Sequence, residues 1–232
     1  MFTGHLIQPD FYGYCNHSAG WADATKGVVH YRNLCIEKGV SFISGARGTV
    51  TGFEKDVQGR IIAVQTASGH PLEGEHFILA AGAWSNKLIP MHNSTLATGQ
   101  VLGYIKLTPE EMHRLKDMPI YVNLETGWFV FPPHEETGFL KCAVHGWGYT
   151  RTETQEPSSP PITSRGERVD FAPVDGVQRL INGLREIFPD IAERGFDRTA
   201  VCWYNDTPTG DFIMDYHPDH SNLFVATGGS GQ

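Results

Sequence analysis

The sequence predicts an α/β fold combined with a second region made mostly of β-strands. Two segments have apolar residues at three- and four-residue steps, which is the period of a helix, and the short runs between them alternate as strands do. One run is continuously apolar and ends at a glycine turn, which is typical of a parallel strand. The 232 residues, 40% of them hydrophobic, are enough for one large or two small domains with a sizeable core.

The first part of the chain predicts a helix followed by strands. Residues 20–38 predict the helix, and Gly39 predicts its end. Residues 40–43 predict a short strand directly after it, as in many α/β connections. Residues 50–54 and 61–66 alternate on either side of a turn and predict a β-hairpin.

The middle of the chain predicts a buried parallel strand and then a larger group of strands. Residues 75–81 contain the continuous apolar run, Phe77–Ala81, and the turn at Gly82 predicts a binding loop at the carboxyl end of this strand. Thr108 as N-cap and Pro109 at the first helical position predict a short helix. Further strands are predicted at residues 101–105, 128–131 and 139–145.

The last part predicts a loop, a helix and a return to strands. Residues 152–168 are rich in Pro, Ser and Thr, which indicates an exposed loop. Residues 174–188 have the pattern of an amphipathic helix, which Pro189 ends. The final strands are predicted at residues 200–204, 212–215 and 223–226.

Charge, hydrophobicity and cysteine spacing disfavour several classes of function. The formal net charge is −8 and no cluster of Lys and Arg occurs, which disfavours binding to nucleic acid or to an anionic membrane. The longest apolar stretches are too short to cross a bilayer, and the N-terminus has no hydrophobic leader, so we expect a soluble intracellular protein. The four cysteines are far apart without a C-x-x-C pair, which disfavours a metal site and a disulfide framework.

Two basic residues share one face of the strand predicted at residues 139–145. Side chains alternate along a strand, so Lys141 and His145 point the same way as Ala143, whereas Leu140 and Cys142 point to the other side. Two basic groups directed into one space are candidates for a catalytic site. The alternative is a half-exposed strand with a solvated polar face.

Three segments together carry a family resemblance. The first is Ile78–Ser85, which contains A-G-A-W, and the second is Leu140-Lys141 with His145 four residues after the lysine. The third begins Cys202-x-Tyr204-x-x-Thr207-Pro208, continues through Asp215-x-His217-Pro218 and closes in Gly228-Gly229-Ser230-Gly231. From about Gly13 onward the chain resembles the FAD-dependent amine oxidases that include monomeric sarcosine oxidase, pipecolate oxidase and fructosyl amino acid oxidase.

The resemblance implies catalytic roles for Lys141 and His145 and a cofactor-binding role for Cys202. Lys141 would lie near the flavin ring and assist the reduction of O₂, for which a compact ammonium is suited because it stabilises developing negative charge. His145 would lie in the substrate pocket and affect the protonation of the amine. Cys202 would form a thioether to the flavin, which requires an accessible thiolate. The alternative for Cys202 is a buried structural cysteine.

The resemblance also implies a set of residues that contact the cofactor. Gly82, Ala83 and Trp84 would lie near its pyrophosphate and ribose, and the turn at Thr207 would reach the edge of the flavin. Asp215 and His217 look structural. The closing glycines would let the backbone approach the flavin, although an ordinary mobile tail is the alternative. This closing cluster comprises Gly228, Gly229, Ser230 and Gly231.

The chain does not contain the G-x-G-x-x-G motif that such enzymes use to hold the pyrophosphate at a helix N-terminus. We therefore expect the isolated chain to bind FAD weakly or not at all. A truncated gene product, a partial gene model and a repurposed remnant would all have this sequence.

The resemblance implies a partial FAD-binding domain of the two-dinucleotide-domain flavoprotein type with a mixed-sheet substrate-binding region. We expect residues 1–91 to form part of the FAD-binding region, residues 92–200 the substrate-binding region, and residues 201–232 a return to the first. The implied reaction is oxidation of a secondary amine in a small amino-acid-like substrate, with O₂ converted to H₂O₂, in the cytoplasm or peroxisome. The alternatives are a non-redox remnant and a cofactor-independent enzyme that reuses the pocket.

Overall fold

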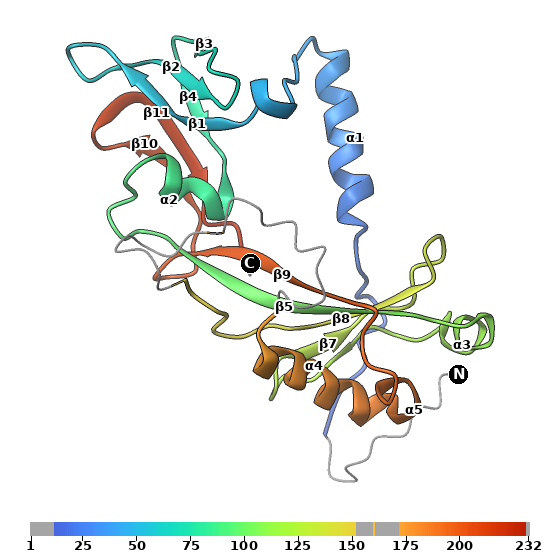
Figure 1. Cartoon of the computed structure of the whole chain (residues 1–232). Helices are drawn as coiled ribbons and strands as arrows, with labels where there is room; N and C mark the ends of the chain where they lie inside the picture. The colour runs from blue at the N-terminus through green and yellow to red at the C-terminus, as the bar shows by residue number, and fades with distance from the viewer. Residues whose placement is uncertain (1–11, 152–159, 161–171, 231–232) are drawn as a thin grey trace. The chain divides into compact units, whose positions relative to one another are not determined.

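The computed structural model describes residues 12–151, 160 and 172–230 (Figure 1). The chain divides into two compact units, each assembled from segments that are far apart in the sequence. Unit 1 consists of Met1–Trp21, Thr98–Thr150 and Pro160–Trp203. Unit 2 consists of Ala22–Ala97, Arg151–Ser159 and Tyr204–Gln232.

Unit 1 contains a five-stranded sheet in the order β6-β7-β8-β5-β9. Neighbouring strands from β6 to β5 pair antiparallel, and Tyr104 of β5 lies opposite Lys141 of β8. The strands are β5 (Leu96–Lys106), β6 (Tyr121–Val122), β7 (Trp128–Val130), β8 (Phe139–Val144) and β9 (Arg198–Asp206). The helices are α3 (Pro109–Leu115), α4 (Val174–Ile187) and α5 (Pro189–Ala192).

The core of unit 1 lies between α4 and one face of this sheet, as Figure 1 shows. Leu180 and Leu184 of α4 are fully buried against Trp128, whose indole N–H donates a hydrogen bond of 3.1 Å to the Leu180 carbonyl. The apolar stripe of α4 explains this packing, because a helix with one apolar side buries it against a sheet. The opposite face of the sheet is therefore the one available for chemistry.

Unit 2 contains two three-stranded sheets, one in the order β1-β2-β3 and one in the order β10-β11-β4. Asn222 donates hydrogen bonds to the carbonyls of Ile61 and Glu75 and so links β11 to the first sheet. The helical elements are α1 (Ala24–Glu37), η1 (Gly45–Arg47), η2 (Gly82–Trp84) and α2 (Ser85–Leu88). The strands are β1 (Val50–Lys55), β2 (Ile61–Thr66), β3 (Leu72–Glu73), β4 (Phe77–Leu79), β10 (Ile213–His217) and β11 (His220–Thr227).

The fold confirms most of the predicted elements. The helix predicted at residues 20–38 is α1, with Asp23 as its N-cap and Gly39 in the left-handed region at φ 84°. The predicted hairpin is β1–β2, and Thr108 begins α3 with a complete capping box. The mixed α/β architecture is also confirmed. The predicted loop at residues 152–168 lies outside the described residues except for Pro160.

Two local predictions are wrong. Residues 40–43 form no strand, because no described segment pairs with them along a ladder. The predicted strand at residues 75–81 is present as β4 and is parallel to β11, but it is not buried on both faces, since Ile78 is 72% exposed. None of the described helices is long and apolar enough to span a membrane.

Gly183 of α4 allows the close approach of the helix to Trp128, because a Cβ at this position would lie 2.2 Å from the indole. We expect Gly183→Ala to lower the free energy of unfolding by about 2 kcal/mol, because overpacking costs up to about 3 kcal/mol and better helix propensity contributes about 1 kcal/mol. Gly27→Ala in α1 is the matched control, since its Cβ would meet nothing within 4 Å, and it should raise the same free energy. Urea unfolding followed by circular dichroism measures both, and equal values for Gly183→Ala and wild type would contradict the packing.

Candidate functional site

Lys141 lies half-buried on the face of the unit 1 sheet opposite α4. The predicted alternation is present, since Leu140 and Cys142 point into the core on the helix side. The Lys141 Nζ is 5.4 Å from the centre of the Phe131 ring. The backbone N–H of Phe131 donates a hydrogen bond of 3.1 Å to the Lys141 carbonyl, which fixes the two residues side by side.

Tyr104 and Arg198 extend this face across the next two strands. The Arg198 guanidinium carbon lies 4.1 Å from the centre of the Tyr104 ring. Burial raises the pKa of the Tyr104 hydroxyl, and the nearby Arg198 charge opposes that rise. The cross-strand register then places Tyr104 opposite Lys141, so an aromatic ring separates the two cations.

His145 is exposed and follows the last residue of β8. Its backbone N–H donates to the Gly127 carbonyl at 2.9 Å, and a Cβ on Gly127 would lie 1.9 Å from the His145 carbonyl oxygen. The next residue, Gly146, exchanges two hydrogen bonds of 3.1 and 3.2 Å with the buried Gln100 amide. These contacts hold the backbone of His145 at the margin of the sheet.

Cys202 is exposed in β9, and alternation along the strand places it on the same face as Arg198. Because Arg198 stacks on Tyr104, this is also the face of Lys141. Cys142 differs, since burial raises the pKa of its thiol to about 12. The structure thus brings Lys141 and Cys202 to one face and leaves His145 at its edge.

Unit 2 places two of the predicted glycine turns at one edge of a sheet. Strands β4 and β11 are parallel, with Leu79 opposite Val225. Three residues beyond these partners, Gly82 and Gly228 both have left-handed backbones, with φ of 53° and 75°. Because the carboxyl ends of parallel strands meet at the same edge, this is the position at which α/β sheets bind ligands.

The turn at Thr207 packs against the same glycine segment. The Thr207 hydroxyl donates a hydrogen bond of 2.8 Å to the Asp211 carbonyl, and a Cβ on Gly228 would lie 2.8 Å from the Thr207 methyl group. The backbone N–H of Asn205 donates to the Ser230 hydroxyl at 2.8 Å. The structure therefore groups Thr207, Gly228 and Ser230 within unit 2.

The remaining predicted cofactor residues differ in accessibility. Ala83 is buried, Trp84 is 37% exposed, and Gly229 is exposed. Gly231 lies outside the described residues.

Sequence reasoning missed Tyr104, Arg198 and Asn205. Alternation in β5 and β9 would have shown which face each residue takes. The pairing of these strands, which are about ninety residues apart, had no signal in the sequence.

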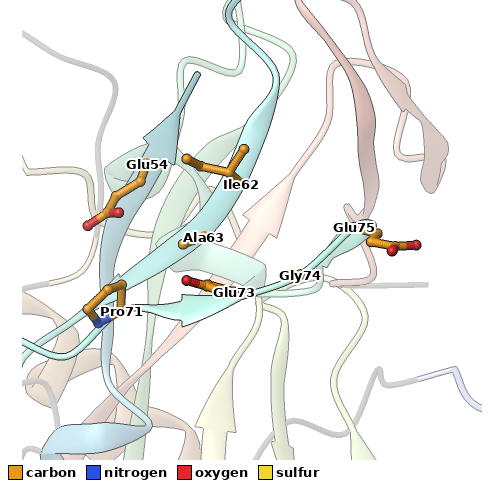
Figure 2. A pocket seen from close by; sticks show the side chains of 7 residues that line it. All are labelled: Glu54, Ile62, Ala63, Pro71, Glu73, Gly74 and Glu75. Carbon is orange, nitrogen blue, oxygen red and sulfur yellow. The ribbon is translucent and has the colours of Figure 1, made fainter. Parts of the chain in front are cut away.

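A hollow of about 390 Å³ lies beside the β1-β2-β3 sheet of unit 2 (Figure 2). Its lining includes the acidic residues Glu54, Glu73 and Glu75, and it contains none of the predicted site residues. An acidic lining opposes an amino-acid carboxylate, so this hollow is a poor candidate for the substrate site.

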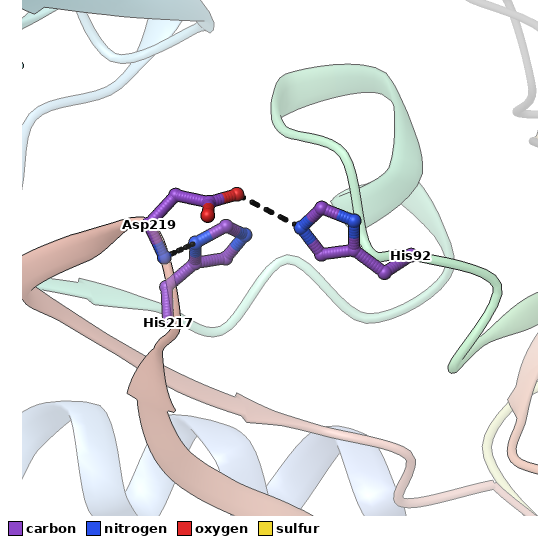
Figure 3. Close-up of side chains that lie close together, drawn as sticks. All are labelled: His92, His217 and Asp219. Atoms are coloured by element: carbon purple, nitrogen blue, oxygen red, sulfur yellow. Dashed lines mark hydrogen bonds and ion pairs between the residues drawn. The ribbon is translucent and has the colours of Figure 1, made fainter.

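His92, His217 and Asp219 converge at the end of β10 (Figure 3). The His92 Nε2 is 2.9 Å from the Asp219 carboxylate, and His92 has a left-handed backbone at φ 49°. Both ring nitrogens of His217 are already used, one with the Pro90 carbonyl at 2.9 Å and the other with the Asp219 backbone N–H at 3.2 Å. This cluster therefore joins the loop before β5 to the β10–β11 turn.

The sequence profile of the family described as DAO, FAD dependent oxidoreductase, matches residues 4–232. The chain belongs to this FAD-dependent oxidoreductase family. It is 28% identical over 242 residues to the L-saccharopine oxidase of Schizosaccharomyces pombe, covering 100% of this chain and 56% of the relative. It is 27% identical over 206 residues to the monomeric sarcosine oxidase of a Bacillus species, covering 87% and 48%.

Solved structures show the same fold. The fructosamine oxidase Amadoriase II of Aspergillus fumigatus superposes with a TM-score of 0.81 at 29% identity, covering 92% of this chain and 50% of that chain. Amadoriase I from the same organism gives 0.79 at 29% identity, covering 92% and 48%. The chain spans about half the length of the curated relatives that it matches.

The residues present fit part of a site for FAD. Cys202 offers an accessible thiol, and the glycine edge of unit 2 lets a planar group approach the backbone. The buried side-chain oxygens of Ser85 and Asn205 have no hydrogen-bond partner among the described residues. Buried polar atoms are rarely left without a hydrogen-bond partner. Two such unpaired oxygens, one near each glycine turn, are therefore compatible with a polar ligand.

We expect thiol reagents to distinguish the cysteines of the native chain. Cys202 should react with iodoacetamide, because it is exposed, whereas Cys142 should not, because it is buried and its thiolate is scarce. Peptide mapping by mass spectrometry measures the labelling of each, with exposed Cys15 as the positive control. Labelling of Cys142 at the rate of Cys15 would contradict the assignment of sheet faces.

Proposed function

We propose that this chain carries the substrate-oxidising face of a FAD-dependent amine oxidase that acts on the C–N bond of a secondary amine in an amino-acid-like substrate. One observation carries the proposal: Lys141 and the exposed Cys202 share the open face of one sheet, with His145 at its margin. The names of the relatives support the reaction class, since they include saccharopine, sarcosine and fructosamine oxidases.

In the proposed reaction the substrate loses two electrons and two protons across its C–N bond and becomes an imine, and O₂ becomes H₂O₂. When bound, FAD supplies the hydride-accepting ring and passes the electrons on to O₂. Cys202 would hold this group through a thioether, for which its thiol is accessible.

Lys141 is the residue proposed to assist oxygen reduction. Its ammonium lies beside the Phe131 ring, and no described carboxylate forms an ion pair with it. A cation held in a partly desolvated position stabilises negative charge that develops on oxygen more effectively than one fully surrounded by water. The negative face of the aromatic ring keeps the ammonium in place without neutralising it.

His145 is the residue proposed to position the substrate amine. An imidazole can accept a proton from an ammonium or hydrogen-bond to the neutral amine, and the oxidation requires the nitrogen lone pair to be free. The backbone contacts of His145 with Gly127 and of Gly146 with Gln100 restrict where this imidazole can reach. Its role is therefore orientation and proton exchange at the substrate nitrogen.

The first test is the visible spectrum of the purified chain after incubation with FAD, before and after acid precipitation. A yellow precipitate would support the proposal, because a thioether through Cys202 survives denaturation, and it would show that the expectation of weak FAD binding is wrong. Cys202→Ser should give a colourless precipitate, whereas Cys35→Ser should stay yellow. A wild-type chain that folds and stays colourless would count against the proposal and in favour of a non-redox binding protein.

If the chain takes up flavin, Lys141→Met tests the role in oxygen reduction. We expect the second-order rate of reoxidation by O₂ to fall by about 10²–10³, the usual effect of removing one electrostatic stabiliser. Anaerobic reduction by substrate should change much less. Lys116→Met on the exposed end of α3 is the control with the same change of charge, and stopped-flow absorbance measures both half-reactions. Equal reoxidation by Lys141→Met and wild type would remove Lys141 from the mechanism.

A further inference from the structure

Two histidines of unit 2 are buried and stacked on each other at the turn between β10 and β11. His217 is 4% exposed and His220 is 7% exposed, and their ring centres lie 5.1 Å apart with 22° between the ring planes. The hydrogen bonds of a buried imidazole decide whether it can take up a proton without losing a contact. The proposed oxidation uses neither ring.

The hydrogen bonds of His217 fit only its neutral form (Figure 3). Its Nε2 lies 2.9 Å from the Pro90 carbonyl oxygen and must donate, because a carbonyl oxygen only accepts. Its Nδ1 accepts a hydrogen bond of 3.2 Å from the Asp219 backbone N–H. A second proton on the ring would occupy Nδ1 and set two N–H donors against each other. Protonation of His217 therefore breaks the contact with Asp219.

The hydrogen bonds of His220 also fit only the neutral form. Its Nδ1 donates to the Gly59 carbonyl at 3.1 Å, and its Nε2 accepts from the Lys55 ammonium at 3.0 Å. A proton on Nε2 would displace Lys55 and place a positive charge beside the ammonium. Burial lowers the pKa of His220 and the Lys55 charge lowers it further, whereas the hydrogen bond to Gly59 opposes both effects.

Three charged or titratable side chains of the described part of the chain lie against the pair. Lys55 of β1 disfavours an added proton, because like charges at short range repel. Asp219 favours one, but its carboxylate is 59% exposed and already lies 2.9 Å from the Nε2 of His92. His92 is exposed as well, and its ring centre is 5.6 Å from that of His217, so a proton on His92 adds a further positive charge beside the pair.

The pair connects segments of unit 2 that are far apart in the sequence. Lys55 and Gly59 belong to the β1–β2 hairpin, and Pro90 belongs to the loop between α2 and β5. Strand β11 begins at His220, pairs with β4 and ends next to Gly228. Loss of these contacts would free the turn at one end of the strand whose other end leads into a glycine turn.

We propose that the His217–His220 pair is a proton-sensitive connection that holds the β10–β11 turn to its neighbours at neutral pH and releases it in acid. The inference goes beyond the proposed function, because it requires no cofactor. The attached turn needs both rings neutral, whereas a histidine in a released segment takes up its proton at about pH 6.5. The released form therefore binds more protons below this value, so the contacts are complete above it and weaken as the pH falls.

The test is hydrogen–deuterium exchange of the flavin-free, full-length chain at about pH 7.5 and about pH 5.5, on either side of the ordinary histidine value. Mass spectrometry of its peptides follows residues 216–221, with rates corrected for the intrinsic effect of pH on exchange. Their protection should fall by about tenfold in acid, because each ring loses one hydrogen bond of ordinary strength. Protection of residues 101–105 in β5 should change by less than about twofold, since no such pair holds them.

The double variant His217→Asn, His220→Gln removes both titratable rings and keeps a donor and an acceptor at each position. Its protection should be the same at both pH values. His70→Gln is the matched control, because His70 is exposed in unit 2, and it should behave like the wild type. Lys55→Met keeps both histidines but removes the cation beside His220, so its loss of protection in acid should be less than about half that of the wild type.

Circular dichroism checks that each variant is folded, and Lys55→Met decides the matter alone if the double variant is not. The inference is wrong if protection of the turn in the wild type does not change between the two pH values. It is also wrong if the double variant, or Lys55→Met, loses protection in acid as much as the wild type does.

Discussion

The packing of α4 against one face of the five-stranded sheet decides which side chains of unit 1 remain available for chemistry. Leu180, Leu184 and Trp128 fill that side, and the indole N–H of Trp128 is satisfied by a helix carbonyl. Every second residue of β8 and β5 is then committed to the core. The other residues, among them Lys141 and Tyr104, face away from it, so a structural requirement of the helix determines the composition of the candidate site.

Unit 2 depends on a different constraint, the parallel pairing of β4 with β11. Parallel strands place their carboxyl ends together, and here both strands continue into a glycine with a left-handed backbone. A side chain at Gly228 would collide with Thr207, so the glycine is required by packing as well as by backbone conformation. The Thr207 turn and the glycine turns are consequently one local structure, although they are separated by more than a hundred residues at Gly82.

Interactions between residues that are close in sequence account for most of the elements that were predicted correctly. The capping box at Thr108, the stop at Gly39 and the hairpin β1–β2 depend on contacts between near neighbours, which short patterns describe well. Residues 40–43 show the limit of this reasoning. They have the composition of a strand, but a strand exists only where a partner supplies a ladder, and none of the described segments does so.

Helix α1 shows the same limit for tertiary packing. The spacing of its apolar residues correctly predicted a helix. However, none of its residues is buried, and Val28 and Tyr31 are about 70% exposed. A helix of 14 residues with no buried side is marginal alone in water, because most helical stability in proteins comes from packing. The apolar stripe indicates a surface that can be buried, but whether anything covers it is decided elsewhere in the fold.

The sequence alone determined the class of fold and, through alternation, that Lys141 and Leu140 point to opposite faces of their strand. The motifs around Cys202 and the glycine cluster also indicated the family. These follow from spacing along the chain, because side-chain direction and turn chemistry are set within a few residues. Only the tertiary structure decided that Arg198 stacks on Tyr104, and that this ring lies opposite Lys141. Strand order and register depend on which distant segments bury their apolar faces together, and no local pattern contains that information.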